Sequence, residues 1–190
     1  MSQSTAATLT PQLAALVARV REVVPPARSS GTTRPEVTTA DRVAEAVQPA
    51  LRQPDLLHPE HQVGSGEGYR QHLLYVEPGG SFSVVALVWL PGQATPVHDH
   101  VSWCAVGVYR GEETEIRYRL RGHGTGRSLE IADRLVNEVG SVSGVAPPGD
   151  IHQVMNTGSG KAISIHVYGA DISRLGSSIN RCYDLPLATS

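Results

Sequence analysis

The chain has 190 residues, of which 16 are basic and 18 acidic, giving a formal net charge of −2 at pH 7. This length suits one domain with a real core, and the charge gives no signal for nucleic acid or a membrane surface. Two cysteines are too few for a disulfide framework. Because no secretory signal and no apolar run of ~20 residues is present, we expect a cytoplasmic protein.

Two amphipathic helices are expected at the start of the chain. Thr10-Pro11 has the pattern of an N-cap followed by proline at the first helical position, and apolar residues then recur at helical spacing. A second helix is expected from about Thr38 to the residue before Pro54. We therefore predict an N-terminal helical segment over residues 1–55 with a flexible start.

From Tyr69 onward the sequence consists of short runs rich in β-branched and aromatic residues. Examples are "SFSVVALVWLP", "CAVGVYRG" and "AISIHVYG", and turns such as "EPGG" and "PPGD" divide them. Evenly spaced short strands of this kind are typical of a sandwich or barrel. We predict a mainly β fold with a small barrel over residues 56–175 and an irregular C-terminal segment over 176–190.

Two histidines one residue apart share a face of a strand, so they can converge on one ion. An isolated H-x-H pair is more often decoration of a surface or core than a pair of ligands. The surroundings are more informative, because they follow the longer pattern Gly92-x5-His98-x-His100-x3-Cys104-x6-Gly111.

A second pattern, Pro147-x-Gly149-x2-His152-x3-Asn156, supplies a third histidine after a tight turn. The two patterns together resemble the paired signatures of the cupin superfamily. That resemblance implies a double-stranded β-helix in which three histidines meet at one metal. Cupins usually carry a glutamate ligand where this chain has Cys104, so three neutral imidazoles would leave the metal with open positions. Imidazole suits iron, zinc, copper or nickel, but zinc has no redox chemistry.

A further strand places three polar residues, Ser164, His166 and Tyr168, at alternate positions and so on one face. A half-buried strand whose inward residues happen to be polar would show the same pattern. If they are buried together, they must hydrogen-bond to one another. Such a chain would fix the tautomer of the imidazole and aim a phenol at the open side of the metal.

The stretches "TPVHDHVSWC", "PGDIHQVMN" and "ISIHVYGADI" resemble the thiol dioxygenases, the family of cysteine dioxygenase and 3-mercaptopropionate dioxygenase. The resemblance implies a mononuclear Fe(II) and the addition of both atoms of O₂ to the sulfur of a small carboxylated thiol, giving a sulfinic acid. The implied iron ligands are His98, His100 and His152, and the Ser-His-Tyr strand becomes a relay beside them.

The resemblance implies a covalent crosslink as well. In the mammalian-type enzymes a cysteine at the position of Cys104 forms a thioether with the relay tyrosine, so a Cys104–Tyr168 crosslink is a hypothesis. The alternative is a small buried thiol that packs as a hydrophobic residue.

Substrate binding is suggested by the resemblance at two places. Cysteine-specific members carry "Y-x-R", whereas this chain has Tyr69 and Gln71, as in mercaptopropionate-type enzymes. Those enzymes take a carboxylate-binding arginine from the segment after the relay tyrosine, where this chain has Gly176 and Ser177. Two arginines of that segment remain as candidates for the carboxylate, and they are Arg174 and Arg181.

Two alternatives stay open. One is a three-histidine cupin dioxygenase or isomerase with a non-thiol substrate, and the other is a non-catalytic metal-binding cupin. Neither makes use of the Ser-His-Tyr strand. We expect a small-molecule thiol and O₂ as partners, with no nucleic acid and no membrane, and the sequence leaves the oligomeric state open.

Overall fold

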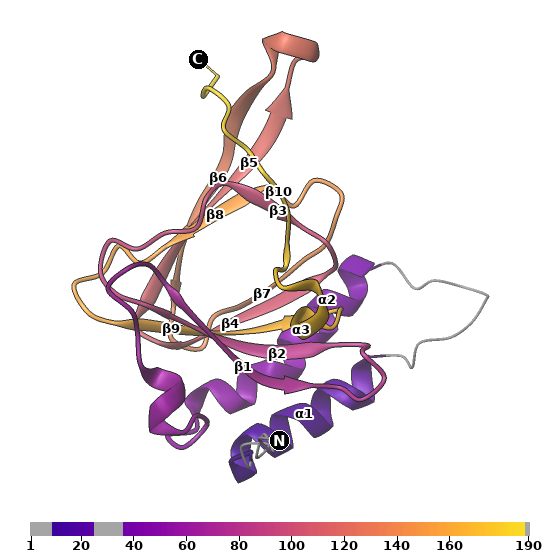
Figure 1. Cartoon of the computed structure of the whole chain (residues 1–190), viewed down its shortest axis with the longest axis vertical. Coiled ribbons are helices and arrows are strands. Elements are labelled where there is room, and N and C mark those ends of the chain that lie inside the picture. The colour runs from indigo at the N-terminus through magenta and orange to yellow at the C-terminus, as the bar shows by residue number, and fades with distance from the viewer. Residues whose placement is uncertain (1–8, 25–35, 189–190) are drawn as a thin grey trace, which may run out of the picture.

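The computed structural model describes residues 9–24 and 36–188, and Figure 1 shows its architecture. The described helices are α1 (Pro11–Val23), α2 (Glu36–Val47) and the short α3 (Ile172–Leu175), with 3₁₀ turns η1 (Gln48–Arg52), η2 (Pro59–Gln62) and η3 (Gly124–Gly126). The described strands are β1 (Arg70–Val76), β2 (Ser83–Trp89), β3 (His98–His100), β4 (Cys104–Arg110), β5 (Glu112–Arg121), β6 (Ser128–Glu138), β7 (Val142–Val145), β8 (His152–Met155), β9 (Ala162–Tyr168) and β10 (Ile179–Cys182).

The strands form two five-stranded antiparallel sheets, in the orders β1-β2-β9-β4-β7 and β10-β3-β8-β5-β6. In Figure 1 the two sheets face each other, with the β5–β6 hairpin projecting beyond them beside the C-terminal end. This arrangement confirms the prediction of a mainly β, double-stranded β-helix preceded by two helices.

Strands β2 and β9 are buried on both faces, which explains why their sequences read as continuous apolar runs. In β2 the outward side chains pack against the N-terminal helices and the inward ones line the interior between the sheets. The outward set is Val84, Ala86 and Val88, and the inward set is Val85, Leu87 and Trp89.

The N-terminal helices cover the outer face of the first sheet (Figure 1). As predicted, Thr10 caps α1, and its hydroxyl accepts a hydrogen bond from the backbone of Leu13 at 3.0 Å. Helix α2 begins at Glu36, slightly before the expected position. It approaches β7 so closely that a Cβ added at Gly144 would lie 2.7 Å from the backbone of residues 40 and 41. The helices therefore brace the sheet.

The C-terminal segment is not wholly irregular, contrary to the prediction for residues 176–190. Residues 179–182 form β10, which pairs with β3 and so lies beside the first two histidines. Tyr183 and Asn180 both donate hydrogen bonds to Asp99, at 2.7 Å and 3.2 Å, which hold this segment in place.

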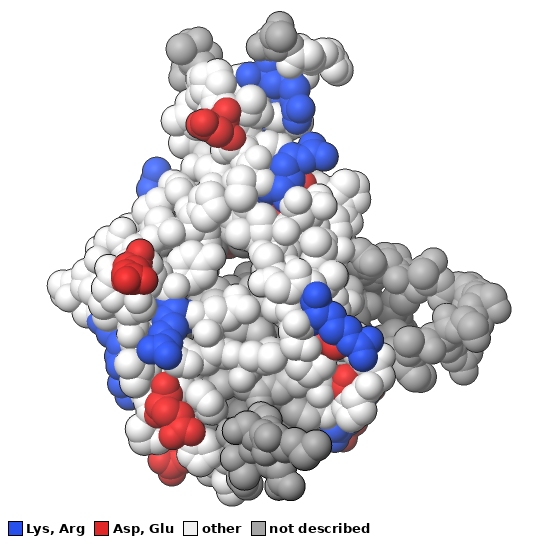
Figure 2. All heavy atoms as spheres, viewed as in Figure 1, with Lys and Arg blue, Asp and Glu red and all other residues white. Residues whose placement is uncertain are grey.

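The described surface carries scattered charges. Figure 2 shows basic and acidic side chains interspersed over one face, with no large area of a single sign there. Among the described residues, no helix is both long enough and apolar enough to cross a bilayer.

Candidate metal centre

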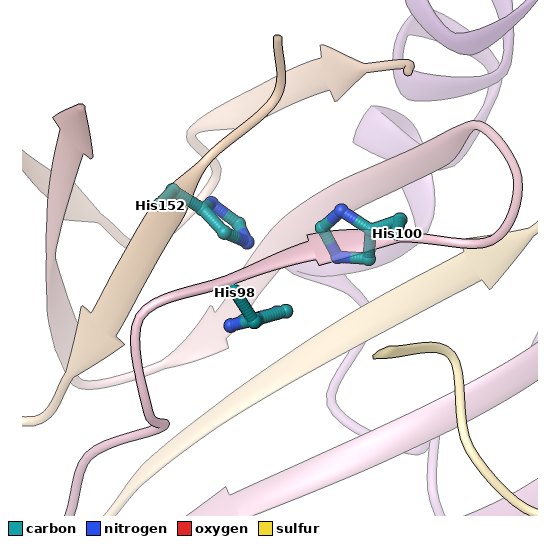
Figure 3. Close-up of side chains that lie close together, drawn as sticks. All are labelled: His98, His100 and His152. Atoms are coloured by element: carbon teal, nitrogen blue, oxygen red, sulfur yellow. The ribbon is translucent and has the colours of Figure 1, made fainter. Parts of the chain in front are cut away.

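Three histidine rings converge between the sheets (Figure 3). His98 and His100 project from β3, and His152 projects from β8 directly opposite His98. Each of the three residues is 4% exposed. One ring nitrogen from each histidine faces the shared space, and these three nitrogens lie within 4.8 Å of one another. The predicted three-histidine site is therefore present, because the period of two along β3 and the pairing of β3 with β8 bring the rings together.

The other ring nitrogen of each histidine is held from behind. Nδ1 of His98 donates to the backbone carbonyl of Pro96 at 2.9 Å, which can only accept. Nδ1 of His100 lies 2.9 Å from Asp150, and Nδ1 of His152 lies 2.8 Å from Glu115. These acceptors place the hydrogen on Nδ1, so Nε2 is left with its lone pair toward the shared space.

The electrostatics fit this assignment. Burial, together with the neighbouring His152, lowers the pKa of His98 to about 3, so its ring is neutral and able to bind a metal. Burial by itself would raise the pKa of Glu115, but hydrogen bonds from His152 and Arg117 outweigh it and bring the pKa to about 2. An ionised carboxylate therefore stands behind His152 at neutral pH.

These residues fit a divalent transition metal. Three imidazoles, two of them backed by carboxylates, are the donor set and outer support typical of such sites. Three ligands do not fill the coordination shell, which leaves positions for small molecules. The described residues thus form a buried three-histidine metal site.

The Ser-His-Tyr strand forms a continuous hydrogen-bonded chain. Ser164 Oγ lies 2.9 Å from Nε2 of His166, and the Tyr168 hydroxyl lies 3.2 Å from Nδ1 of the same ring. All three residues are at most 4% exposed. The ring centroid of Tyr168 lies 6.2 Å from that of His100, so the phenol faces the metal site.

The two titratable members of this chain are kept in neutral forms. Burial, with contributions from the metal-site histidines, lowers the pKa of His166 to about 3. Burial raises the pKa of Tyr168 well above its ordinary value. The strand therefore offers a neutral imidazole and an intact O–H group at neutral pH.

Cys104 is fully buried directly opposite Tyr168 in the β4–β9 pairing. Its Sγ lies 3.8 Å from Nδ1 of His166. Burial raises the pKa of its thiol well above the ordinary value, so it is not an exposed reactive thiolate.

A small cavity opens onto the histidines. It has a volume of about 40 Å³. Tyr69 and Gln71 line it, as the resemblance implied, and Tyr168 and His166 lie on its wall. The remaining lining residues are mostly apolar or hydroxyl-bearing: Leu87, Trp89, Thr95, Val154, Ser177, Ser178 and Ile179.

The two arginines proposed for the carboxylate do not line this cavity. The Arg174 side chain is 85% exposed and pairs with Asp171 at 3.2 Å. Arg181 is exposed and lies over the ring of Tyr183, 5.8 Å from its centroid. Within residues 9–24 and 36–188, no lysine or arginine lines the cavity.

Three residues of the site were missed from the sequence: Glu115 and Asp150, which hold histidines, and Ser178, which lines the cavity. Asp150 had a usable signal, because it lies in the turn two residues before His152. The other two had none in the local pattern. Ser177, which the resemblance placed at the position of an arginine, also lines the cavity.

Two facing sheets around a buried three-histidine site define a metal-binding protein of the cupin class. The sequence profile of the cysteine dioxygenase type I family matches residues 64–177, so the chain belongs to that family.

Solved structures of similar shape include several cupins. A protein from Thermus thermophilus is 19% identical, with 61% of this chain and 97% of that one covered and a TM-score of 0.44. An uncharacterized conserved protein with a double-stranded β-helix domain from Klebsiella pneumoniae is 20% identical, with coverages of 63% and 92% and a TM-score of 0.46. A Cupin 2 conserved barrel domain protein from Salinispora arenicola is 20% identical, with coverages of 57% and 82% and a TM-score of 0.39.

Proposed function

We propose that the protein is a mononuclear Fe(II) thiol dioxygenase that converts a small thiol and O₂ into a sulfinic acid. The observation that carries this proposal is the buried Ser164–His166–Tyr168 chain, whose phenol faces the same cavity as the three histidines. Membership of the cysteine dioxygenase type I family supports it. A site that only stored or sensed a metal would have no need of such a chain.

His98, His100 and His152 would hold the iron through Nε2. Bound Fe(II) supplies the redox chemistry that joins O₂ to sulfur. The chain's own residues do the rest: Tyr168 offers a neutral O–H that can hydrogen-bond to substrate or exchange a proton with it. His166 behind it fixes the direction of that O–H group, and the apolar wall of Leu87, Trp89 and Val154 limits the entry of water.

The proposed substrate is a thiol of 3-mercaptopropionate size or a close relative. The cavity is small, with a volume of about 40 Å³. Gln71, rather than an arginine, lines this cavity, and so do the hydroxyl-bearing residues Tyr69, Ser177 and Ser178. A carboxylate would be held there by neutral donors.

A thioether between Cys104 and Tyr168 remains part of the proposal, supported by their direct pairing across β4 and β9. Its formation removes two hydrogen atoms, the thiol hydrogen and one ring hydrogen of Tyr168, which O₂ as the oxidant would take up. An intact mass lower by those two atoms, with a crosslinked peptide, is the expected result, and an unmodified mass would remove the idea.

The deciding experiment is oxygen consumption by the iron-loaded protein with cysteine, 3-mercaptopropionate, cysteamine and mercaptosuccinate in turn. We expect uptake with at least one thiol and a sulfinate product. His152→Ala should lose both iron and turnover. A protein that takes up only zinc after expression in iron-rich medium, or that consumes no oxygen with any thiol, would contradict the proposal.

A further inference from the structure

One wall of the cavity is a thin stretch of chain near the C-terminus. Ser177, Ser178 and Ile179 line the cavity from the segment between α3 and β10. Ser177 is itself exposed, and so are residues 180–182 of β10. β10 lies at the edge of its sheet, with β3 as its neighbour. On this side a single layer of chain therefore separates the cavity from solvent. We call residues 177–183 the strap.

The strap is fixed at both of its ends. At its start, α3 is anchored by the buried Ile172 and ends at Gly176, whose φ of 76° turns the chain. At its end, the backbone N–H of Tyr183 donates to the carbonyl just before β3 at 2.8 Å. Between these points, the pairing with β3 is irregular after Ile179. The middle of the strap therefore depends more on side-chain contacts than a regular edge strand would.

Asp99 supplies such contacts from the strand that carries two of the metal-site histidines. It lies between His98 and His100 on β3, so its side chain points to the opposite face of that strand. Its Oδ1 accepts from the Asn180 side chain at 3.2 Å, and its Oδ2 accepts from the Tyr183 hydroxyl at 2.7 Å. Hydrogen bonds to a carboxylate are stronger than those between neutral groups. One strand thus presents histidines to the cavity and holds the strap.

We propose that Asp99 is a positioning residue that holds the strap against the cavity and thereby limits the size of the molecules that reach the metal. Asp99 does not line the cavity, so it acts through the strap. Without its two hydrogen bonds the strap opens more often, because its middle keeps only the irregular pairing with β3. Larger molecules then enter a cavity whose closed volume is about 40 Å³. The consequence for thiol selection rests on the proposed function, whereas access to the metal does not.

Access to the metal is measured by the rate at which an excess of chelator removes zinc from the full-length protein. We expect Asp99→Ala to release zinc about 10-fold faster or more, because two hydrogen bonds to a carboxylate are lost. The equilibrium affinity for zinc should stay within about 3-fold of wild type, because an open strap eases entry as much as exit. An unchanged release rate would overturn the proposal. So would an affinity that falls in proportion to the faster release, since Asp99 would then act on the ligands.

Matched variants separate an effect on the strap from an effect on β3. Tyr183→Phe removes one of the two hydrogen bonds and leaves Asp99 in place, so it should speed release by less than Asp99→Ala does. Asp99→Asn keeps one acceptor oxygen and should have an intermediate rate. Asp133→Ala, which removes an exposed carboxyl on β6, should release zinc like wild type. If Asp99→Ala does not fold, the double variant Asn180→Ala with Tyr183→Phe removes the same two hydrogen bonds and gives the decision.

The size of the thiol is a second measurement, made with 3-mercaptopropionate and the longer 6-mercaptohexanoate, which carry the same charge. In the iron-loaded protein, Asp99→Ala should raise kcat/KM for the longer thiol relative to the shorter one by about 10-fold, mainly through a lower KM. A ratio equal to that of wild type would overturn the proposal for substrates. Absence of oxygen uptake with any thiol in wild type would instead contradict the proposed function, and the zinc-release result would stand apart from it.

Discussion

Glu115 accepts hydrogen bonds from two sides, from Nδ1 of His152 at 2.8 Å and from Arg117 at 2.9 Å. The carboxylate thereby fixes the His152 ring with Nε2 toward the metal site, and Arg117 fixes the carboxylate. Nothing in the ligand pattern itself provides this orientation.

Replacing Glu115 with Ala should weaken binding of Co(II) or Zn(II) by about 10- to 100-fold, although all three ligands remain. The measurement is a competition titration against a chelator. Glu115→Gln keeps an acceptor and should lose less. Glu112→Ala on the same strand is the matched control. Unchanged affinity in Glu115→Ala would mean that packing, rather than this hydrogen bond, orients the ring.

Tyr168→Phe should keep the bound iron and slow oxygenation by about 10²- to 10⁴-fold, because the cavity loses its O–H group while the ligands are untouched. Iron content and initial rates on the same samples check this. Tyr109→Phe is a control for deleting another buried hydroxyl, since Tyr109 donates to the carbonyl of Pro54 at 2.7 Å and packs in the cluster that includes the N-terminal helices. Full activity in Tyr168→Phe would refute its role.

The parts of the site that obey strand periodicity were accessible from the sequence. His98 and His100 share a face because side chains alternate, and the same rule groups Ser164, His166 and Tyr168. The fold followed from short strands divided by glycine and proline turns. These features depend on neighbours in the chain, so no knowledge of distant pairing was required.

The parts that depend on distant pairing were not accessible. Glu115 reaches His152 across a separation of 37 residues, and Asp150 reaches His100 across 50. The pairing of β10 with β3 is irregular between Ile179 and Arg181. The alternation of side chains along a regular strand therefore does not predict on which side of β10 the Arg181 side chain lies. The strand itself was missed because "INRC" has little apolar pattern and is ordered by pairing with β3.

The composition of the cavity predicts a weak dependence on substrate charge. No described lysine or arginine lines it, while Asp150 and Glu115 stand behind the histidines. We expect 3-mercaptopropionate and its isosteric amide to differ by less than about 10-fold in kcat/KM, since only neutral hydrogen bonds distinguish them. Ser177→Arg, at the cavity wall, should shift the preference toward the acid. A preference of wild type for the acid by more than about 100-fold would contradict this, because it requires a charged partner.

Glu113 should make stability depend on pH in an identifiable way. Its carboxyl keeps its proton up to about pH 7 in the folded chain but would release it near 4.5 when unfolded. Unfolding between these values therefore releases a proton, so stability falls as pH rises through this range and levels off above it. Glu113→Gln removes that loss. Relative to wild type, the variant should gain about 3 kcal/mol between pH 4 and pH 8, the size of the pKa difference.

Urea unfolding of both metal-free proteins at several pH values measures this gain. Glu112→Gln, which changes an exposed carboxyl on the same strand, should show no comparable gain. Only the change with pH in the difference between the two unfolding free energies is used. A destabilisation by the buried amide that is the same at every pH therefore cancels. A difference between Glu113→Gln and wild type that stays the same at every pH would mean that Glu113 ionises as readily folded as unfolded. Its burial beside Ser164 and Trp89 would then impose no penalty on the charge.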